Sequence, residues 1–152
     1  MKNLVILVGI VLCMNAIHAQ AQVKAPLNEL QPDKPSLFTD FPEKSIINRV
    51  AIAGIFEGIS SGNVKFSLEN NRQLVGIILE KQVKSEHVIT ANIRLPQYDQ
   101  ALFTISRTTD SNGNHAYSGT IIHIKYGDVL ILKEDNGQLY LLKEKRSLFL
   151  VE

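Results

Sequence analysis

Residues 101–122 read Ala101-Leu-Phe-Thr-Ile-Ser-Arg-Thr-Thr-Asp110-Ser-Asn-Gly-Asn-His115-Ala-Tyr-Ser-Gly-Thr-Ile-Ile122, and this stretch decides the fold. Its first part alternates apolar and polar residues with a period of two, which predicts a strand over 101–108 with one buried face. The Asn112-Gly113 pair supplies residues that accept a positive φ, so a tight hairpin loop is expected over 110–114. The returning strand is predicted over 116–125. An antiparallel hairpin is therefore the basic unit of this chain.

The same pattern continues on both sides of this hairpin. Turn residues such as Asn70-Asn71 and Asn136-Gly137 separate short apolar runs, and no helical segments alternate with them. This arrangement predicts a mainly β fold, an antiparallel meander that forms a small barrel or a sandwich. The pattern alone does not distinguish the two. Further strands are predicted over 64–68, 73–83, 87–95, 128–134, 138–144 and 147–151.

Residues 46–59 are ambiguous between a helix and a strand. Ile46, Val50 and Ala53 have helical spacing, with Ser45 as a candidate N-cap and Gly58 as a candidate end. The β-branched content argues for a strand instead. We favour one short helix that begins near Arg49, at the start of a β-rich domain over 46–152.

The first 21 residues have the layout of a secretory signal peptide. Lys2 precedes an apolar run over 4–14, and Ala19-Gln20-Ala21 supplies the small-residue pattern that signal peptidases accept. The run is shorter than the ~20 residues that a membrane span requires. We therefore expect an exported protein of the periplasm, the cell surface or the exterior, with no membrane span in the mature chain.

Residues 22–45 contain four of the five prolines of the chain, which predicts an extended linker or N-terminal arm. Leu37, Phe38 and Phe41 interrupt this arm, and an exposed linker has little use for such residues. We expect them to anchor the arm against the domain.

The single cysteine, Cys13, lies in the leader, so the mature chain is expected to contain no disulfide. Val11 and Leu12 precede it where a lipid-modified cysteine normally follows a small residue, so a lipoprotein is not favoured. Once Lys2 is removed with the leader, basic and acidic residues are equal in number. This balance argues against a nucleic-acid partner, which usually meets a basic surface.

The chain offers only weak candidates for a metal or catalytic site. The spacing of His87, His115 and His123 matches no metal-ligand motif, and zinc would require a closed sheet that brings His87 near His123. The loop over 110–114 lacks the ligand alternation of a calcium loop, and a hairpin already explains it. No cofactor is predicted. Carboxylates that could act in pairs are Glu80, Glu86, Asp99 and Asp128, but for Asp99 and Asp128 we favour ordinary turn chemistry.

The absence of a catalytic motif favours a non-catalytic binding protein with a protein or peptide partner. Meanders present hairpin loops and sheet edges, which suit recognition by strand addition. One alternative is an inhibitor or propeptide-like domain whose arm, 22–45, lies in the cleft of a secreted peptidase. Another is a small-molecule-binding barrel or an enzyme. The loops over 97–100, 109–115 and 135–138 are the expected interaction surfaces, and their candidate residues are Tyr98, Asp99, Asn112, His115 and Asn136.

Overall fold

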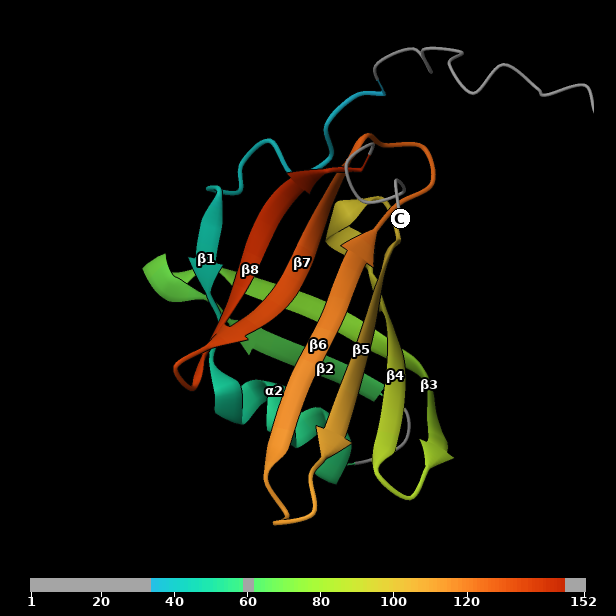
Figure 1. Ribbon diagram of the computed structural model, residues 1–152. Coiled ribbons are helices and arrows are strands. Elements are labelled where there is room, and N and C mark those ends of the chain that lie inside the picture. Colours follow the sequence, from blue (N-terminus) through green and yellow to red (C-terminus); the bar gives the residue numbers. More distant parts are fainter. Residues whose placement is uncertain (1–33, 59–61, 147–152) are drawn as a thin grey trace, which may run out of the picture. The chain divides into compact units, whose positions relative to one another are not determined.

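The computed structural model describes residues 34–58 and 62–146, which form one antiparallel sheet and a short helix (Figure 1). The eight strands follow the order β1-β8-β7-β6-β5-β4-β3-β2, so the chain from β2 to β8 is a meander and β1 pairs with β8. The predicted mainly β, antiparallel fold is confirmed, and it is a single sheet rather than a sandwich. The strands are β1 (Lys44–Ile46), β2 (Gly62–Ser67), β3 (Gln73–Ser85), β4 (Val88–Leu95), β5 (Ala101–Thr109), β6 (His115–Ile122), β7 (Asp128–Asp135) and β8 (Gln138–Lys145).

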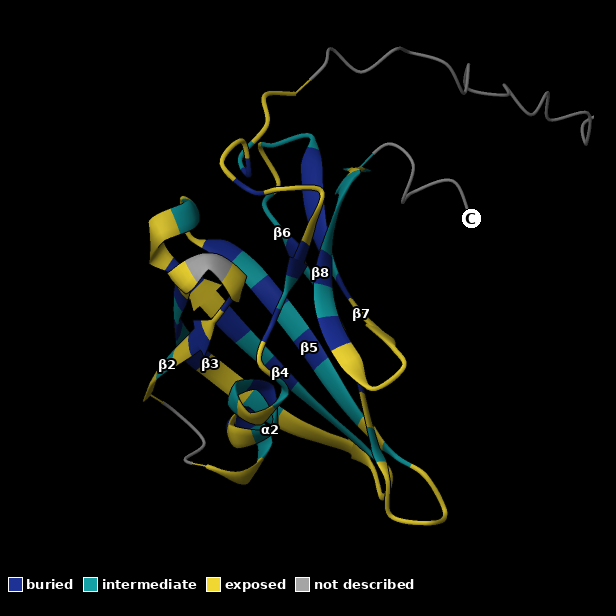
Figure 2. Ribbon diagram, turned by 90° about the vertical axis from the view of Figure 1, so that its left-hand side faces the viewer, coloured by how far each residue is buried: buried dark blue, intermediate teal, exposed yellow. Residues whose placement is uncertain are grey.

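The sheet curls into a half-barrel whose two outermost strands approach each other at one point. The amide of Ile47, just after β1, donates to the carbonyl of Leu139 on β8 at 3.0 Å. The next amide, of Asn48, donates to the carbonyl of Ser67 at the end of β2 at 3.2 Å. Two consecutive residues therefore join the opposite edges of the sheet. Helix α2 (Arg49–Glu57) follows immediately and packs on the inner face of the curl (Figure 2).

The predicted hairpin turns are present, with one difference in their backbone. Asn136 and Gly137 both have positive φ, 49° and 77°, as a two-residue hairpin requires. In the other hairpin Gly113 has a φ of 82°, whereas Asn112 does not adopt a positive φ. The Asp110 carboxylate accepts the amides of Asn112 and Asn114, each at 2.8 Å, and these bonds shape the loop instead. They contribute to a lowered pKa of Asp110, for which the side-chain bond from Asn114 is the largest cause.

Strand β6 ends at Ile122, three residues before the predicted end at 125. The expectation that His123 lies inside the strand is therefore wrong. Its ring nitrogen Nδ1 accepts the amide of Lys125 at 3.2 Å, and its carbonyl accepts the amide of Tyr126 at 3.2 Å. These local bonds turn the chain before β7 begins. Two 3₁₀ turns complete the described elements, η2 (Glu69–Asn71) and η3 (Pro96–Tyr98).

The favoured helix in residues 46–59 is confirmed, and it begins at Arg49 as expected. The N-cap is Asn48, whose side chain accepts the amide of Val50 at 2.8 Å, so the assignment of this role to Ser45 is wrong. Ser45 is buried within β1. Gly58 ends the helix and donates its amide to the carbonyl of Gly54.

Gly54 is exposed on α2, and a Cβ there would meet nothing within 4 Å. Glycine in a helix is less favourable than alanine by about 0.5–1 kcal/mol because it loses more backbone freedom on folding. We expect Gly54→Ala to raise the free energy of unfolding by about that amount. Urea denaturation followed by far-ultraviolet circular dichroism measures the change. A lower midpoint would contradict the exposed position of this residue.

The core lies between the inner face of the sheet and α2. Ile52 and Ile55 are the buried residues of the helix, and they face strands that supply Phe66 and Phe103. The rings of Phe66 and Phe103 meet edge to face, with centroids 5.8 Å apart. Large side chains therefore occupy the interior of the curl.

The segment over 34–43 lies on the opposite end of the core from the β5–β6 hairpin. Phe38 and Phe41 are buried, which confirms that they anchor the arm. Their rings are 5.8 Å apart, and each lies 5.5 Å from the ring of Tyr98 on η3. Residues 1–33 and 147–152 lie outside the described part of the chain, and with them the predicted signal peptide, the first half of the Pro-rich arm (22–33) and the predicted strand over 147–151.

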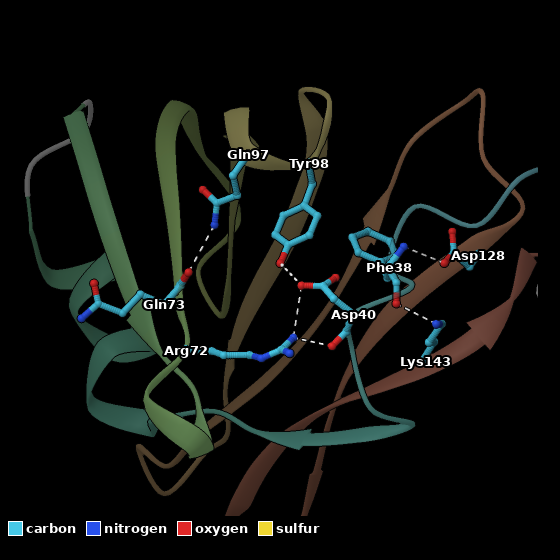
Figure 3. A network of polar contacts seen from close by, with 8 residues as sticks. All are labelled: Phe38, Asp40, Arg72, Gln73, Gln97, Tyr98, Asp128 and Lys143. Carbon is cyan, nitrogen blue, oxygen red and sulfur yellow. Dashed lines mark hydrogen bonds and ion pairs between the residues drawn. The ribbon is translucent and has the colours of Figure 1, made fainter.

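The buried carboxylate of Asp128 holds this segment in place (Figure 3). It accepts the amides of Leu37 and Phe38 at 2.7 and 2.8 Å and the hydroxyl of Ser36. The ammonium group of Lys143 donates a hydrogen bond to the carbonyl of Phe38 at 2.6 Å. The turn role predicted for Asp128 is therefore wrong, because its partners lie about ninety residues away in the chain.

Candidate binding surface

Two arginines and two aromatic rings form a cluster beside α2, to which the helix contributes Arg49 from its first turn and Phe56 from its last turn. The guanidinium carbon of Arg107 lies 5.4 Å from the ring centroid of Phe56, and that of Arg49 lies 5.1 Å from the ring centroid of Tyr117. The two rings are 5.8 Å apart and tilted by 34°. Both distances place a cation over an aromatic face, where the ring quadrupole attracts it. We call these four residues the Arg–aromatic cluster.

The alternation of β5 brings Arg107 to this position. Phe103 and Ile105 are buried on the inner face, and Arg107 occupies the next inward position toward the end of the strand. The register pairs Arg107 with Tyr117 on β6, and Phe56 reaches the pair from the last turn of α2. The inner face of the sheet, which is otherwise apolar along β5, therefore carries a positive charge at Arg107, beside the last turn of α2.

Arg49 is fully engaged within the fold. It forms an ion pair with Glu134 on β7 and donates to the backbone carbonyl of His115 on β6. Strands β6 and β7 pair only over Gly119–Ile122 and Val129–Leu132. They therefore diverge at the other end, where β6 begins at the β5–β6 hairpin and β7 ends at the β7–β8 hairpin. The Arg49 guanidinium links the strands across this divergence. Its main role is structural.

Arg107 has no such partners among the described residues. Arg107 forms no ion pair with a carboxylate of the described residues. Its buried Nε atom also has no hydrogen-bond acceptor in this part of the chain. Buried polar atoms nearly always have a partner, so an exception needs an explanation. The guanidinium fork can bind both oxygens of a carboxylate at once. Arg107, a half-buried residue, is therefore the cation of the cluster that has no carboxylate partner among the described residues.

The electrostatics of Tyr117 reflect both arginines. Burial raises the pKa of the Tyr117 hydroxyl, while the positive charges of Arg49 and Arg107 act in the opposite direction. Glu57 and Glu134 raise the pKa again. Burial is the largest cause, so the hydroxyl stays protonated and can donate a hydrogen bond beside the two cations.

Three of the predicted interaction residues lie at the same end of the strands as this cluster. His115 begins β6, its carbonyl accepts from Arg49, and its Nδ1 lies 3.0 Å from the hydroxyl of Thr109. Asn112 and Asn136 occupy the exposed turns of the two neighbouring hairpins. The structure thus gathers the loops over 109–115 and 135–138 on one end of the sheet.

Tyr98 and Asp99 lie at the other end, so the structure does not bring all five predicted residues together. Tyr98 is packed against the arm, and its hydroxyl donates to Asp40 at a long 3.5 Å (Figure 3). Asp40 also pairs with Arg72 at 3.2 Å. Burial is the largest cause of the raised pKa of Tyr98, followed by the negative charge of Asp40. These contacts hold the arm in place and leave Tyr98 little freedom to bind a partner.

Asp99 belongs to a small polar group that the sequence did not indicate. Its carboxylate accepts the hydroxyl of Tyr126 at 3.3 Å and lies 3.7 Å from Nε2 of His123. Because Nδ1 of His123 already accepts the amide of Lys125, a neutral ring carries its proton on Nε2, facing Asp99. His87 lies in the turn between β3 and β4, at the opposite end of the strands. The condition for the zinc alternative, His87 near His123, is therefore not met.

Of the remaining candidate carboxylates, Glu86 is exposed in the turn between β3 and β4, and Glu80 has partners within the sheet. Glu80 accepts from Asn92 at 2.7 Å and from Gln82 at 2.9 Å on the outer face. Asp110 is used by its own hairpin. Residues 34–58 and 62–146 contain no group of three or more side chains that could hold a metal ion. In the same residues, no helix has the length and apolar character needed to cross a bilayer.

Sequence reasoning missed Arg107, Arg49 and Phe56. The signal for Arg107 was available, because a cation at an inward position of an otherwise apolar strand is unusual and invites a search for its partner. The positions of Phe56 and Arg49 depend on how α2 docks, which no local pattern specifies.

Comparison with known proteins adds nothing to this geometry. The chain matches no protein-family model, no curated protein and no solved structure.

Proposed function

We propose that this chain is an exported, non-catalytic binding protein that recognises an acidic segment of a protein or peptide partner at the Arg–aromatic cluster. The observation that carries the proposal is Arg107, stacked on Phe56 with no acidic partner among the described residues. A carboxylate offers the guanidinium two acceptors in one plane, which is the geometry that arginine binds best.

The neighbours of Arg107 support a peptide rather than a small anion. In the strand register Arg107 lies opposite Ile89, and Ile89 lies opposite Val83 on β3. Ile89 is half-buried, and Val83 is 74% exposed. An acidic residue bound at Arg107 would thus have apolar surface beside it for its neighbouring side chains. Acidic and apolar residues in alternation are the expected recognition pattern.

The two alternatives receive less support from the geometry. In an inhibitor the arm would lie in a peptidase cleft, but its part over 34–43 is bound to its own sheet through Asp128 and Phe38. A small-molecule barrel would need interior space, and Phe66, Phe103 and the isoleucines of α2 fill the described interior. A surface interaction is therefore the function that these residues support best.

A selection from a library of random displayed peptides tests the proposal directly. We expect the purified protein to enrich peptides with a recurring Asp or Glu next to apolar residues. Arg107→Gln should weaken binding of the enriched peptides about tenfold or more, because it removes a charge-assisted hydrogen-bond pair. Arg107→Lys keeps the charge but not the fork, and we expect an intermediate loss. Fluorescence anisotropy of the labelled peptides measures these affinities.

Arg94→Gln is the matched control, because Arg94 is an exposed arginine at an outward position of β4. Its affinity for the peptides should equal that of the unchanged protein. The proposal fails if no acidic pattern is enriched, or if Arg107→Gln and Arg94→Gln bind the peptides equally well. Circular dichroism of each variant shows whether a loss of binding comes from loss of the fold.

A further inference from the structure

The longest strand of the sheet has an edge that its neighbour covers only in part. β3 contains 13 residues, but β2 pairs only with Gln73–Ile78. Leu79–Ser85 pair with β4 on one side and with no described strand on the other. Within this stretch Val83 is 74% exposed and Leu79 is 48% exposed, and most of it is exposed in Figure 2. An unpaired strand edge beside exposed apolar side chains is a template for another strand.

Hydrogen bonds near the start of β3 show which backbone groups face this open edge. The side-chain amide of Gln97 donates to the carbonyl of Gln73, and its oxygen accepts the amide of Val75 at 3.2 Å. The backbone groups of residues 73 and 75 therefore point away from β2, and those of Ile78 point toward it. A bulge follows at Leu79 and shifts the alternation by one residue, and a second register shift lies between Val83 and Ser85, so the regular part of the open stretch is Glu80–Val83.

After the bulge, Lys81 and Val83 direct their backbone N–H and C=O groups to the open edge. The hydrogen bonds of β4, which pairs with β3, give the same orientation for Lys81 and Val83. The carbonyl of His87 accepts an amide of β5 at 2.8 Å, so odd-numbered residues here face β5 and even-numbered residues face β3. Those even-numbered residues lie opposite Glu80 and Gln82. Within residues 34–58 and 62–146 no strand pairs with the outward-facing backbone groups of Lys81 and Val83, so these groups can bond with an added strand.

The open stretch is complementary to itself in an antiparallel arrangement. When Lys81 lies opposite Val83 of a second copy, both outward-facing residues find outward-facing partners, and Gln82 lies on the two-fold axis. The same register places Glu80 opposite Lys84 of the second copy, and Lys84 opposite its Glu80. These opposite charges are on the same exposed face, where Gln82 already bonds to both. Directly opposed charges of opposite sign stabilise strand pairs.

The other registers allowed by the outward-facing residues are less favourable. One places Lys81 opposite Lys81, and the other places Glu80 opposite Glu86, at the turn. Like charges directly opposite each other destabilise strand pairing. Charge therefore selects the register centred on Gln82, in which Val83 lies against the aliphatic part of Lys81 of the second copy.

We propose that two copies of this chain associate through the free part of β3, pairing antiparallel about Gln82 to extend one sheet into the next. This inference rests on the backbone edge of β3 and not on Arg107, although the exposed side chain of Val83 belongs both to this edge and to the apolar surface of the proposed function.

Sedimentation velocity over a range of protein concentrations tests the association, with protein purified after expression of the full chain. We expect a concentration-dependent dimer. Val83→Pro should abolish it, because proline removes an N–H that faces the open edge and takes no bond from β4. Lys84→Glu should raise the dissociation constant about tenfold, because it places like charges opposite each other at two symmetric positions.

A charge exchange distinguishes a specific pair from a damaged fold. Glu80→Lys combined with Lys84→Glu restores opposite charges across the axis, so we expect this double variant to dimerise again. Lys65→Glu, on the exposed face of β2, is the control and should leave the dimer unchanged. A protein that stays monomeric up to about 1 mM overturns the inference. So does a dimer that is insensitive to Val83→Pro or is not restored by the charge exchange.

Discussion

Alanine at position 119 should destabilise the protein by about 3 kcal/mol or more, although it adds only one methyl group. Gly119 lies in the middle of β6, between Ile105 of β5 and Leu132 of β7. A Cβ there would be 2.6 Å from the carbonyl oxygen of Thr104 and 3.0 Å from the Cα of Ile105. Both are backbone atoms, so relief requires β5 and β6 to separate. Domains of this size are stable by only about 5–15 kcal/mol, so the expected loss is a large part of the total.

Urea denaturation followed by circular dichroism measures this loss as a lower midpoint with little change in slope. Gly54→Ala is the matched control, because the same substitution on the exposed side of α2 meets no atom within 4 Å and should raise the midpoint. Opposite signs for the two variants are the specific prediction. A midpoint for Gly119→Ala equal to that of the unchanged protein would show that β5 and β6 are not this close.

Replacing Asp128 with alanine should cost about 3–5 kcal/mol and release the arm from the sheet. The carboxylate accepts the amides of Leu37 and Phe38 and the hydroxyl of Ser36. Removing it leaves these donors without an acceptor, and the amide of Phe38 is buried. Hydrogen bonds to a charged group contribute about 1.5–3 kcal/mol each, and part of that loss is regained when water reaches the freed arm.

Hydrogen exchange measured by nuclear magnetic resonance identifies the mechanism. In Asp128→Asn, which keeps the shape but turns one acceptor into a donor, the amides of Leu37 and Phe38 should exchange rapidly while those of β5 stay protected. Asp135→Asn, at the exposed end of the same strand, should leave all of them unchanged. Continued protection of residues 37 and 38 in Asp128→Asn would mean that something other than this carboxylate holds the arm.

The strands and turns could be predicted from the sequence because their causes are local. A period of two in the apolar residues specifies which face of a strand is buried, and it located β2 to β8 to within a few residues. Asn136-Gly137 specified its hairpin because those residues accept the required backbone angles. Even the end of α2 at Gly58 followed from residue type.

The closure of the sheet could not be predicted, because its contacts join distant residues. Nothing near Asn48 indicates that its amide bonds to Ser67 while the preceding amide bonds to β8. Similarly, Asp128 was assigned to its own turn because nothing local distinguishes a carboxylate that binds nearby amides from one that binds Leu37 and Phe38.

The candidate site could be predicted only in part. Successive turns of a meander lie at alternate ends of the sheet, so the sequence already implied that the loop containing Tyr98 and Asp99 lies far from those containing Asn112 and Asn136. The alternation along residues 101–108 also contained the signal that Arg107 lies on the inner face, although we drew no prediction from it. What the sequence lacked was the docking of α2, which brings Phe56 to Arg107 and turns a single inward cation into a cluster.

The position of β1 beside β8 has a consequence for the order in which the protein can fold. Residues 34–46 are synthesised early, yet their partners on β7 and β8 are synthesised about ninety residues later. Until those strands exist, the amides of Leu37 and Phe38 lack their acceptor, Asp128, and the edge-joining bonds of Ile47 and Asn48 cannot both form. Contacts of such long sequence separation close late and slow the final step of folding. The growing chain therefore cannot close its sheet until almost all of it has been made.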